Sequence, residues 1–366
     1  MEVFTMSKIY AASILLFLLL SHPAQRLAFE TDQYNLPTTP LADIGDELHE
    51  YTLENIQRAI GKINAEIVTK QTCIDRTTDR LPYCRNVAAD RKRLEYLRSE
   101  AAVAREIFGR LGYGIIAFAR AGNWINSHKF RAQPARFKTS FANSIFVSIP
   151  TDYFTISPTV NVYGVQFGTD KIAHFFQQGY QYYRIHERET AKGAREPNAT
   201  QKAVAWGRMT ENTYYGTLVG GVFSNADLYA NYAGMRFFEG LAKAVKIGNF
   251  TRPATLVLKN GVWELNVPGV SNENLLRPFI SEHLNEALNP SLYIPGLRSS
   301  IRGIVRRQSC PQWRTLLPAR TREDFQSVTD SLSLWNGENY GHKESKKFVT
   351  IANTCFADSA ADFDKP

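Results

Sequence analysis

The stretch Gly168–Tyr183, GTDKIAHFFQQGYQYY, constrains the fold and the function of this chain more than any other segment. It reads as the beginning of an aromatic helix, predicted over about residues 169–188. Asp170 and His174 are four residues apart, so they share one face of that helix. A carboxylate and an imidazole on one face can form an acid/base pair or half of a metal site.

A second polar segment follows some forty residues later, in apolar and glycine-rich surroundings: TENTYYGTLVGGVFSNADLYANYAG, residues 210–234. Asp227 and Asn231 are four residues apart among alanines, so we expect them to point into a cleft between helices. A buried Glu211 beside tyrosines would have a raised pKa, which suits a general acid. The structural alternatives are a helix cap at Asp227, an Asn231 bonded to backbone, and a capping or surface Glu211.

These two segments supply the candidate catalytic residues Asp170, His174, Glu211 and Asp227, with His174 as base or metal ligand and Glu211 as acid. Tyrosines that cluster around polar groups can line a cleft for sugar or lipid, although such tyrosines are more often core residues. The candidate ligand-binding residues are Lys171, Tyr180, Tyr183, Tyr215 and Asn231.

The identity of a bound metal stays unknown at this stage, and a divalent ion is one option for a cofactor. His283 and Glu286 have an H-x-x-E spacing that could provide a second metal half-site, and the alternative is a surface or helix-end position. The sequence contains no G-x-S-x-G, H-E-x-x-H, P-loop or G-x-G-x-x-G motif. This disfavours a serine hydrolase, a zincin and a nucleotide enzyme.

The formal net charge of +8 favours attraction to anionic partners such as an envelope glycan or a lipid surface. A solvated basic surface is the simpler alternative. Nucleic acid is not an expected partner, because no recognised binding motif is present.

The N-terminus has the pattern of a secretory signal peptide over residues 1–24, with Lys8 followed by the apolar run Ser13–Leu20. That run is too short to span a bilayer, and no later apolar run is long enough. We therefore expect a periplasmic or secreted protein without a transmembrane anchor after cleavage. Four cysteines in an oxidising compartment predict two disulfides, and local order favours Cys73–Cys84 and Cys310–Cys355.

The predicted fold is mainly α: a multi-helix globular domain with an N-terminal helical hairpin, clipped by Cys73–Cys84, and one inserted β-hairpin. Apolar residues three or four apart predict the hairpin's helices over 42–70 and 86–111. Asn260-Gly261 between alternating apolar and polar residues predicts the β-hairpin. Further helices are expected over about 200–218, 224–246, 276–288, 295–307 and 321–335.

The predicted organisation has five parts along the chain. They are a signal peptide (1–24), an extended arm (25–40), the helical hairpin (41–111), a main helical domain with the β-hairpin at 254–267 (112–335), and an irregular C-terminal tail (336–366).

The pattern Asp170-Lys171-x-x-His174-Phe175 resembles one found in VanZ-like membrane proteins and in small bacterial envelope proteins. The resemblance covers six residues, and the flanking sequence departs from the VanZ-like proteins because no transmembrane helices surround the motif. It implies a bacterial envelope protein and assigns no catalytic role. Two functions follow: a hydrolase acting on an envelope polymer or lipid, or a non-catalytic protein that binds an envelope glycan or lipid.

Overall fold

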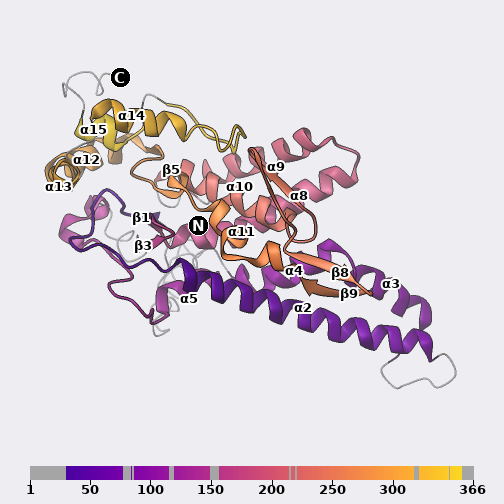
Figure 1. Cartoon of the computed structure of the whole chain (residues 1–366). Helices are drawn as coiled ribbons and strands as arrows, with labels where there is room; N and C mark the ends of the chain where they lie inside the picture. The colour runs from indigo at the N-terminus through magenta and orange to yellow at the C-terminus, as the bar shows by residue number, and fades with distance from the viewer. Residues whose placement is uncertain are drawn as a thin grey trace, which may run out of the picture.

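Helices make up most of the regular structure in the computed structural model of this chain (Figure 1). The structure describes residues 30–76, 84, 86–114, 119–148, 156–213, 216–218, 221–316, 321–345 and 347–356. Within these ranges, every strand belongs to a two-stranded pair, and none of the helices is both long enough and apolar enough to cross a bilayer. The predicted signal peptide lies outside the described residues.

The long helix α2 (Gly45–Asp75) runs along one edge of the molecule (Figure 1). Its buried isoleucines recur three or four residues apart and pack against α3 (Val87–Leu97) and α4 (Glu100–Leu111). The Cys73–Cys84 disulfide closes the connection, so the predicted disulfide-clipped hairpin is confirmed. The returning segment is two helices instead of one, because Ser99 caps α4 by accepting a hydrogen bond from the Ala102 N–H.

The centre of the molecule is built from one long helical segment and two neighbours. The segment comprises α7 (Asp170–Ala173), the π-helical turn η4 (His174–Gln178) and α8 (Gly179–Ala191), which confirms the helix predicted over 169–188. It packs against α9 (Glu196–Glu211) and α10 (Asn225–Glu239). Both neighbours end earlier than predicted, α10 because the chain turns at Gly240 into a strand.

Two glycines allow the central helices to approach backbone to backbone. A Cβ on Gly179 would lie 2.5 Å from the Cα of Gly234, and a Cβ on Gly234 would lie 1.9 Å from the carbonyl oxygen of Phe175. Neither distance leaves room for a methyl group, and the neighbouring atoms are backbone that cannot rotate away.

The strands form small hairpins and bridges between distant segments. The hairpin of β8 (Leu256–Lys259) and β9 (Val262–Leu265) confirms the one predicted, with Asn260 and Gly261 at φ values of 51° and 80°, as its tight turn requires. The sequence did not predict the other pairs. They are β1 (Glu30–Thr31) with β2 (Ile156–Ser157), β3 (Thr159–Val162) with β4 (Val165–Gly168), β5 (Val222–Ser224) with β10 (Ser291–Tyr293), and β6 (Val245–Ile247) with β7 (Phe250–Arg252).

The helix predicted over 276–288 is wrong. The structure has only the single turns η6 (Arg277–Phe279) and η7 (Glu282–Leu284) there. Polar side chains take over backbone hydrogen bonds that a helix would make: the Asn285 side chain accepts from the Ala287 N–H, and the Asn289 side chain donates to the His283 carbonyl.

The C-terminal part contains short helices that pack on one another. They are α12 (Pro295–Ile304), η8 (Val305–Ser309), α13 (Cys310–Leu316), α14 (Arg322–Ser331) and α15 (Ile351–Cys355). Outside this part, the remaining short elements are α5 (Arg120–Ser127), η2 (Phe141–Asn143), η3 (Ile145–Ser148), η5 (Val267–Val270) and α11 (Asn272–Leu275). The tail predicted to be irregular thus holds α15, which the Cys310–Cys355 disulfide joins to α13.

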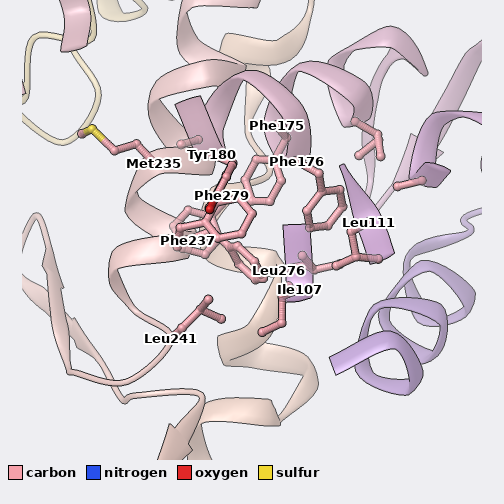
Figure 2. Packing of buried hydrophobic residues seen from close by; sticks show 14 of the residues in the cluster. Ile107, Leu111, Phe175, Phe176, Tyr180, Met235, Phe237, Leu241, Leu276 and Phe279 are labelled. Atoms are coloured by element: carbon pink, nitrogen blue, oxygen red, sulfur yellow. The ribbon is translucent and has the colours of Figure 1, made fainter. Parts of the chain in front are cut away.

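Two apolar clusters form the core. The larger contains aromatic side chains of the central helices, among them Phe175, Phe176 and Phe237, which lie close to Phe279 of η6 in Figure 2. The smaller lies in the C-terminal part around the Cys310–Cys355 disulfide and includes Tyr34 from the predicted extended arm. Two disulfides among the described residues indicate an oxidising environment outside the cytoplasm.

We expect Gly179→Ala and Gly234→Ala each to lower the free energy of unfolding by about 1–3 kcal/mol, because the added methyl group forces the helices apart. Gly61→Ala on exposed α2 is the matched control, since a Cβ there meets nothing within 4 Å. It should raise stability by about 0.5–1 kcal/mol through its helix propensity. Urea unfolding of the three variants checks this, and equal effects at all three sites would contradict the packing argument.

Loss of the Cys310–Cys355 disulfide should cost about 4 kcal/mol and loss of Cys73–Cys84 about 3 kcal/mol, because the loops contain 45 and 11 residues. The paired Cys→Ser variants compared by denaturant unfolding test the order. A larger loss for the Cys73–Cys84 pair would show that native packing outweighs the chain-entropy effect.

Candidate functional site

A buried lysine lies at the centre of the candidate site. The Lys171 Nζ atom is 2.6 Å from Asp170 Oδ2, 2.6 Å from Asp227 Oδ1 and 2.5 Å from Glu286 Oε1. All four side chains are at most 1% exposed. One ammonium group therefore joins three carboxylates from three separate parts of the chain, and we call these residues, together with Glu30, Glu211 and His174, the buried cluster.

A tight approach between the N-terminal segment and α7 brings Asp170 into position. The Thr31 hydroxyl donates to Asp170 Oδ1 at 2.6 Å. Gly168, directly before the helix, makes this contact possible, because a Cβ there would lie 1.8 Å from Thr31 Oγ1. The neighbouring Glu30 enters the cluster from the same strand, β1, and is 3% exposed.

Ser224, the N-cap of α10, connects three acidic residues of the cluster. Its hydroxyl accepts from the Asp227 N–H at 3.1 Å and lies 3.0 Å from Glu286 Oε1, to which it donates. Its own N–H donates to Glu211 Oε1 at 2.9 Å. The capping serine thus fixes Asp227 in the first turn of α10, where the helix dipole favours a negative charge.

His174 has different partners from those predicted. Its Nδ1 atom lies 3.1 Å from Asn231 Oδ1, and its Nε2 atom lies 3.6 Å from Asp227 Oδ1. Asp170 bonds to Thr31 and Lys171 instead, so Asp170 and His174 do not pair with each other as their spacing allows. His174 also opens the π-helical turn η4, and such turns occur often at functional sites.

The four candidate catalytic residues, Asp170, His174, Glu211 and Asp227, are nevertheless brought together, and Asn231 joins them. Glu30 has no counterpart among the residues predicted from the sequence. Glu286 was predicted only through its spacing from His283, which lies outside the cluster and bonds to Ser281 and the Leu334 carbonyl. A buried acidic residue in an N-terminal strand has no sequence signal that separates it from an exposed one.

The electrostatics of the buried cluster are dominated by an excess of acidic groups. Burial and the charges of Glu286 and Asp227 raise the pKa of Glu30, and burial and Asp227 raise the pKa of Glu211. Burial raises the pKa of Glu286 to about 7, against the opposing effect of Lys171. Burial alone would lower the pKa of Lys171, but Asp170, Asp227 and Glu286 together raise it. Lys171 therefore stays charged.

Among the residues that the structure describes, two sets of side chains have the separation of metal ligands. Cys73, Cys84 and Asp90 are one, but the two sulfur atoms form a disulfide and cannot coordinate. Glu30, Asp227 and Glu286 are the other, with one oxygen from each lying within 4.8 Å of the others. Oxygen ligands of this kind suit a hard cation.

Two of the predicted ligand-binding tyrosines, Tyr180 and Tyr183, line a groove of about 1230 Å³ between the helical hairpin and α8. Tyr215 lies outside the described residues. The groove carries aromatic and charged side chains along its length: Lys62, Glu66, Arg93, Tyr96, Arg105, Glu106, Phe108, Tyr113, Tyr180, Tyr183, Arg184, Glu187, Arg188 and Trp206. We call it the hairpin groove.

The comparisons with known proteins give no further guide. No family model matches the chain, and neither a curated protein nor a solved structure matches it.

Lys171→Met should destabilise the protein by about 3–5 kcal/mol, because it leaves buried carboxylates without their cation. Lys192→Met is the control, since Lys192 pairs with Glu189 on the surface with 63% of its side chain exposed. The control should lose less than about 1 kcal/mol. Thermal and urea unfolding at neutral pH measure both, and a Lys171→Met variant as stable as the control would contradict the central role of this ammonium.

Proposed function

We propose that the protein is a non-catalytic binding protein of the bacterial envelope and that its ligand is an acidic glycan held in the hairpin groove. The observation that carries the proposal is the combination in that groove of partly exposed aromatic rings with two arginines, Arg105 and Arg184, that have no acidic partner among the described residues. The N-terminal signal pattern, the disulfides and the D-K-x-x-H-F resemblance support a periplasmic or secreted location.

The aromatic side chains of the hairpin groove suit the apolar C–H faces of sugar rings. Phe108 stacks on Tyr180 with ring centroids 4.2 Å apart, which fixes both rings in the groove. Tyr113 is 61% exposed at one side, and Trp206 is half-buried. Rings held by packing offer contact area with little loss of side-chain entropy when a ligand binds.

The charges of the groove favour an acidic ligand. Lys62 pairs with Glu106 and Arg93 with Glu66, so these charges are already neutralised. Arg105 and Arg184 are exposed and make no ion pair or hydrogen bond within the described part of the chain. Guanidinium groups bind carboxylates and phosphates with two parallel hydrogen bonds, which fits acidic sugars.

The charged side chains that line the hairpin groove favour a glycan over an acyl chain as the ligand. A hydrocarbon tail in the groove would remove water from the carboxylates and guanidinium groups along it, at a cost in free energy for each. Hydroxyl groups of a sugar can replace that water with hydrogen bonds. Pockets for apolar ligands are lined mainly by apolar side chains, with few polar groups.

A hydrolase acting on an envelope polymer or lipid is the second candidate function. Asp170 and Asp227 both contact Lys171, His174 lies beside Asp227, and Glu211 is bonded to the capping Ser224, and this grouping supports it. Each of these side chains is at most 4% exposed, so a polymer would reach them only after the surrounding segments separate. The open hairpin groove needs no such rearrangement, and we therefore prefer the binding function.

A galacturonic acid oligomer is a suitable probe, with a neutral glucose oligomer of equal length as its control. The wild type should bind the acidic oligomer, and Arg105→Gln/Arg184→Gln should bind it at least about tenfold more weakly, because each charge-assisted hydrogen bond contributes about 1.5–3 kcal/mol. Tyr113→Ala should weaken binding while leaving its salt dependence unchanged. Calorimetric titration at two salt concentrations measures these effects.

The matched control variant is Arg307→Gln, which removes an exposed arginine outside the groove and should bind like the wild type. Equal binding by the double variant would exclude the groove as the site. Binding to anionic liposomes but to no acidic oligomer would replace the glycan by a lipid surface. Cleavage of the oligomer that His174→Ala abolishes would favour the hydrolase instead.

A further inference from the structure

We propose that Glu30, Asp227 and Glu286 form a binding site for one calcium ion beside Lys171. This inference depends on neither candidate function, because an ion bound here would stabilise the folded state whatever ligand the hairpin groove holds. It rests on the charge excess of the buried cluster, on oxygen atoms without hydrogen-bond donors, and on the geometry of the three carboxylates.

The charge excess is the first observation. Glu30, Asp170, Glu211, Asp227 and Glu286 are each at most 3% exposed, and Lys171 is the one lysine or arginine that contacts them in the described part of the chain. Five ionised carboxylates and one ammonium group would leave four negative charges in the interior. Uncompensated buried charges cost several kcal/mol each, so protons or a further cation must offset them.

The oxygen atoms without donors are the second observation, and they point to specific members of the cluster. Asp170 accepts from Thr31 and Lys171, Glu286 from Ser224 and Lys171, and Glu211 from the Ser224 N–H.

Glu30 Oε2 and Asp227 Oδ2, in contrast, are fully buried and have no hydrogen-bond donor among the described residues. Buried polar atoms of this kind are rare in folded proteins and require a partner. Among the carboxylates of the buried cluster, Glu30 and Asp227 are the two with such an oxygen, and both belong to the set with metal-ligand spacing, an agreement that is independent of the charge count.

The geometry fits a single ion. One oxygen from each of the three side chains lies within 4.8 Å of the others. Two oxygens that coordinate one ion at about 2.4 Å can be at most about 4.8 Å apart, which is the range for calcium. Among the described residues, the set of Glu30, Asp227 and Glu286 contains carboxylates only, which differs from the nitrogen and sulfur ligands typical of zinc.

Calcium suits the cluster better than magnesium. Calcium accepts six to eight oxygens and binds carboxylates through one or both oxygens. Lys171 holds Asp227 Oδ1 and Glu286 Oε1, so the three carboxylates keep four further oxygens for the ion. Magnesium keeps several of its waters in a strict octahedron. The side chains around Lys171 are packed against one another with almost no exposed surface, which leaves little space for those waters.

Chelator-treated full-length protein, titrated with calcium chloride in a calorimeter, tests the proposal. The wild type should bind one calcium ion per chain with a Kd of about a millimolar or tighter, and its Tm should rise with calcium concentration. Glu30→Gln keeps the size of the side chain but removes a charge, and it should weaken binding about tenfold or more. Magnesium should bind more weakly, and zinc should not replace calcium.

Glu239→Gln is the matched control, because Glu239 is an equally buried carboxylate that pairs with Arg236 outside the cluster. It should keep the calcium response even if it lowers the Tm. Asp227→Asn is the second ligand variant and should lose the response as Glu30→Gln does. Absence of calcium binding by the wild type, equal affinity in Glu30→Gln, or binding of zinc alone would each overturn the proposal.

Discussion

The attraction between the Lys171 ammonium and the carboxylates of Asp170, Asp227 and Glu286 is the interaction on which the centre of this structure depends. At Nζ–O distances near 2.6 Å and with side chains at most 1% exposed, such contacts are strong, but removing four charged groups from water costs free energy of similar size. The net contribution to stability is therefore modest while the whole set is present, and large when one member is missing. What the cluster provides is specificity: α7, α10 and the segment after η7 can meet in one arrangement only, because any other leaves a buried charge unpaired.

Close backbone packing supports this arrangement from outside the cluster. Gly179 and Gly234 let α8 and α10 touch. Along the helical segment, the π-helical turn from His174 to Gln178 lies between Lys171 and Gly179. A π-helical turn inserts one extra residue into a helix and so rotates the side chains before it relative to those after it. In this segment Lys171 and His174 face the cluster, while Phe175 and Phe176 fill the aromatic core shown in Figure 2.

The sequence predicted the elements whose pattern is local and left out those that depend on distant partners. The isoleucine stripe of α2, the Asn260-Gly261 turn and the order of the cysteines each carry a complete signal within a few residues. The helix expected over 276–288 failed because Asn285 and Asn289 bond to backbone, a competition that apolar periodicity does not register. For the candidate site, the spacing of residues in the sequence indicated Asp170, His174 and Asp227. Glu30 and Glu286 are brought in by contacts between distant segments: Thr31, next to Glu30, bonds to Asp170 139 residues later, and Lys171 bonds to Glu286 115 residues later.

One helical segment, from α7 to α8, contributes side chains to both the buried cluster and the hairpin groove. Lys171 and His174 hold the first turns of the segment in the interior, while Tyr180, Tyr183 and Arg184 in α8 line the groove on the side of the helical hairpin. Since a helix transmits the position of its first turns to the turns that follow, the charges around Lys171 help to orient α8, whose exposed Arg184 faces the groove and whose Tyr180 and Tyr183 are buried along it. A cation at Glu30, Asp227 and Glu286 would strengthen that constraint without touching the groove. Under the proposed binding function, the interior charged cluster would affect how well a ligand fits without contacting it, by reducing the freedom of the helix that lines the groove.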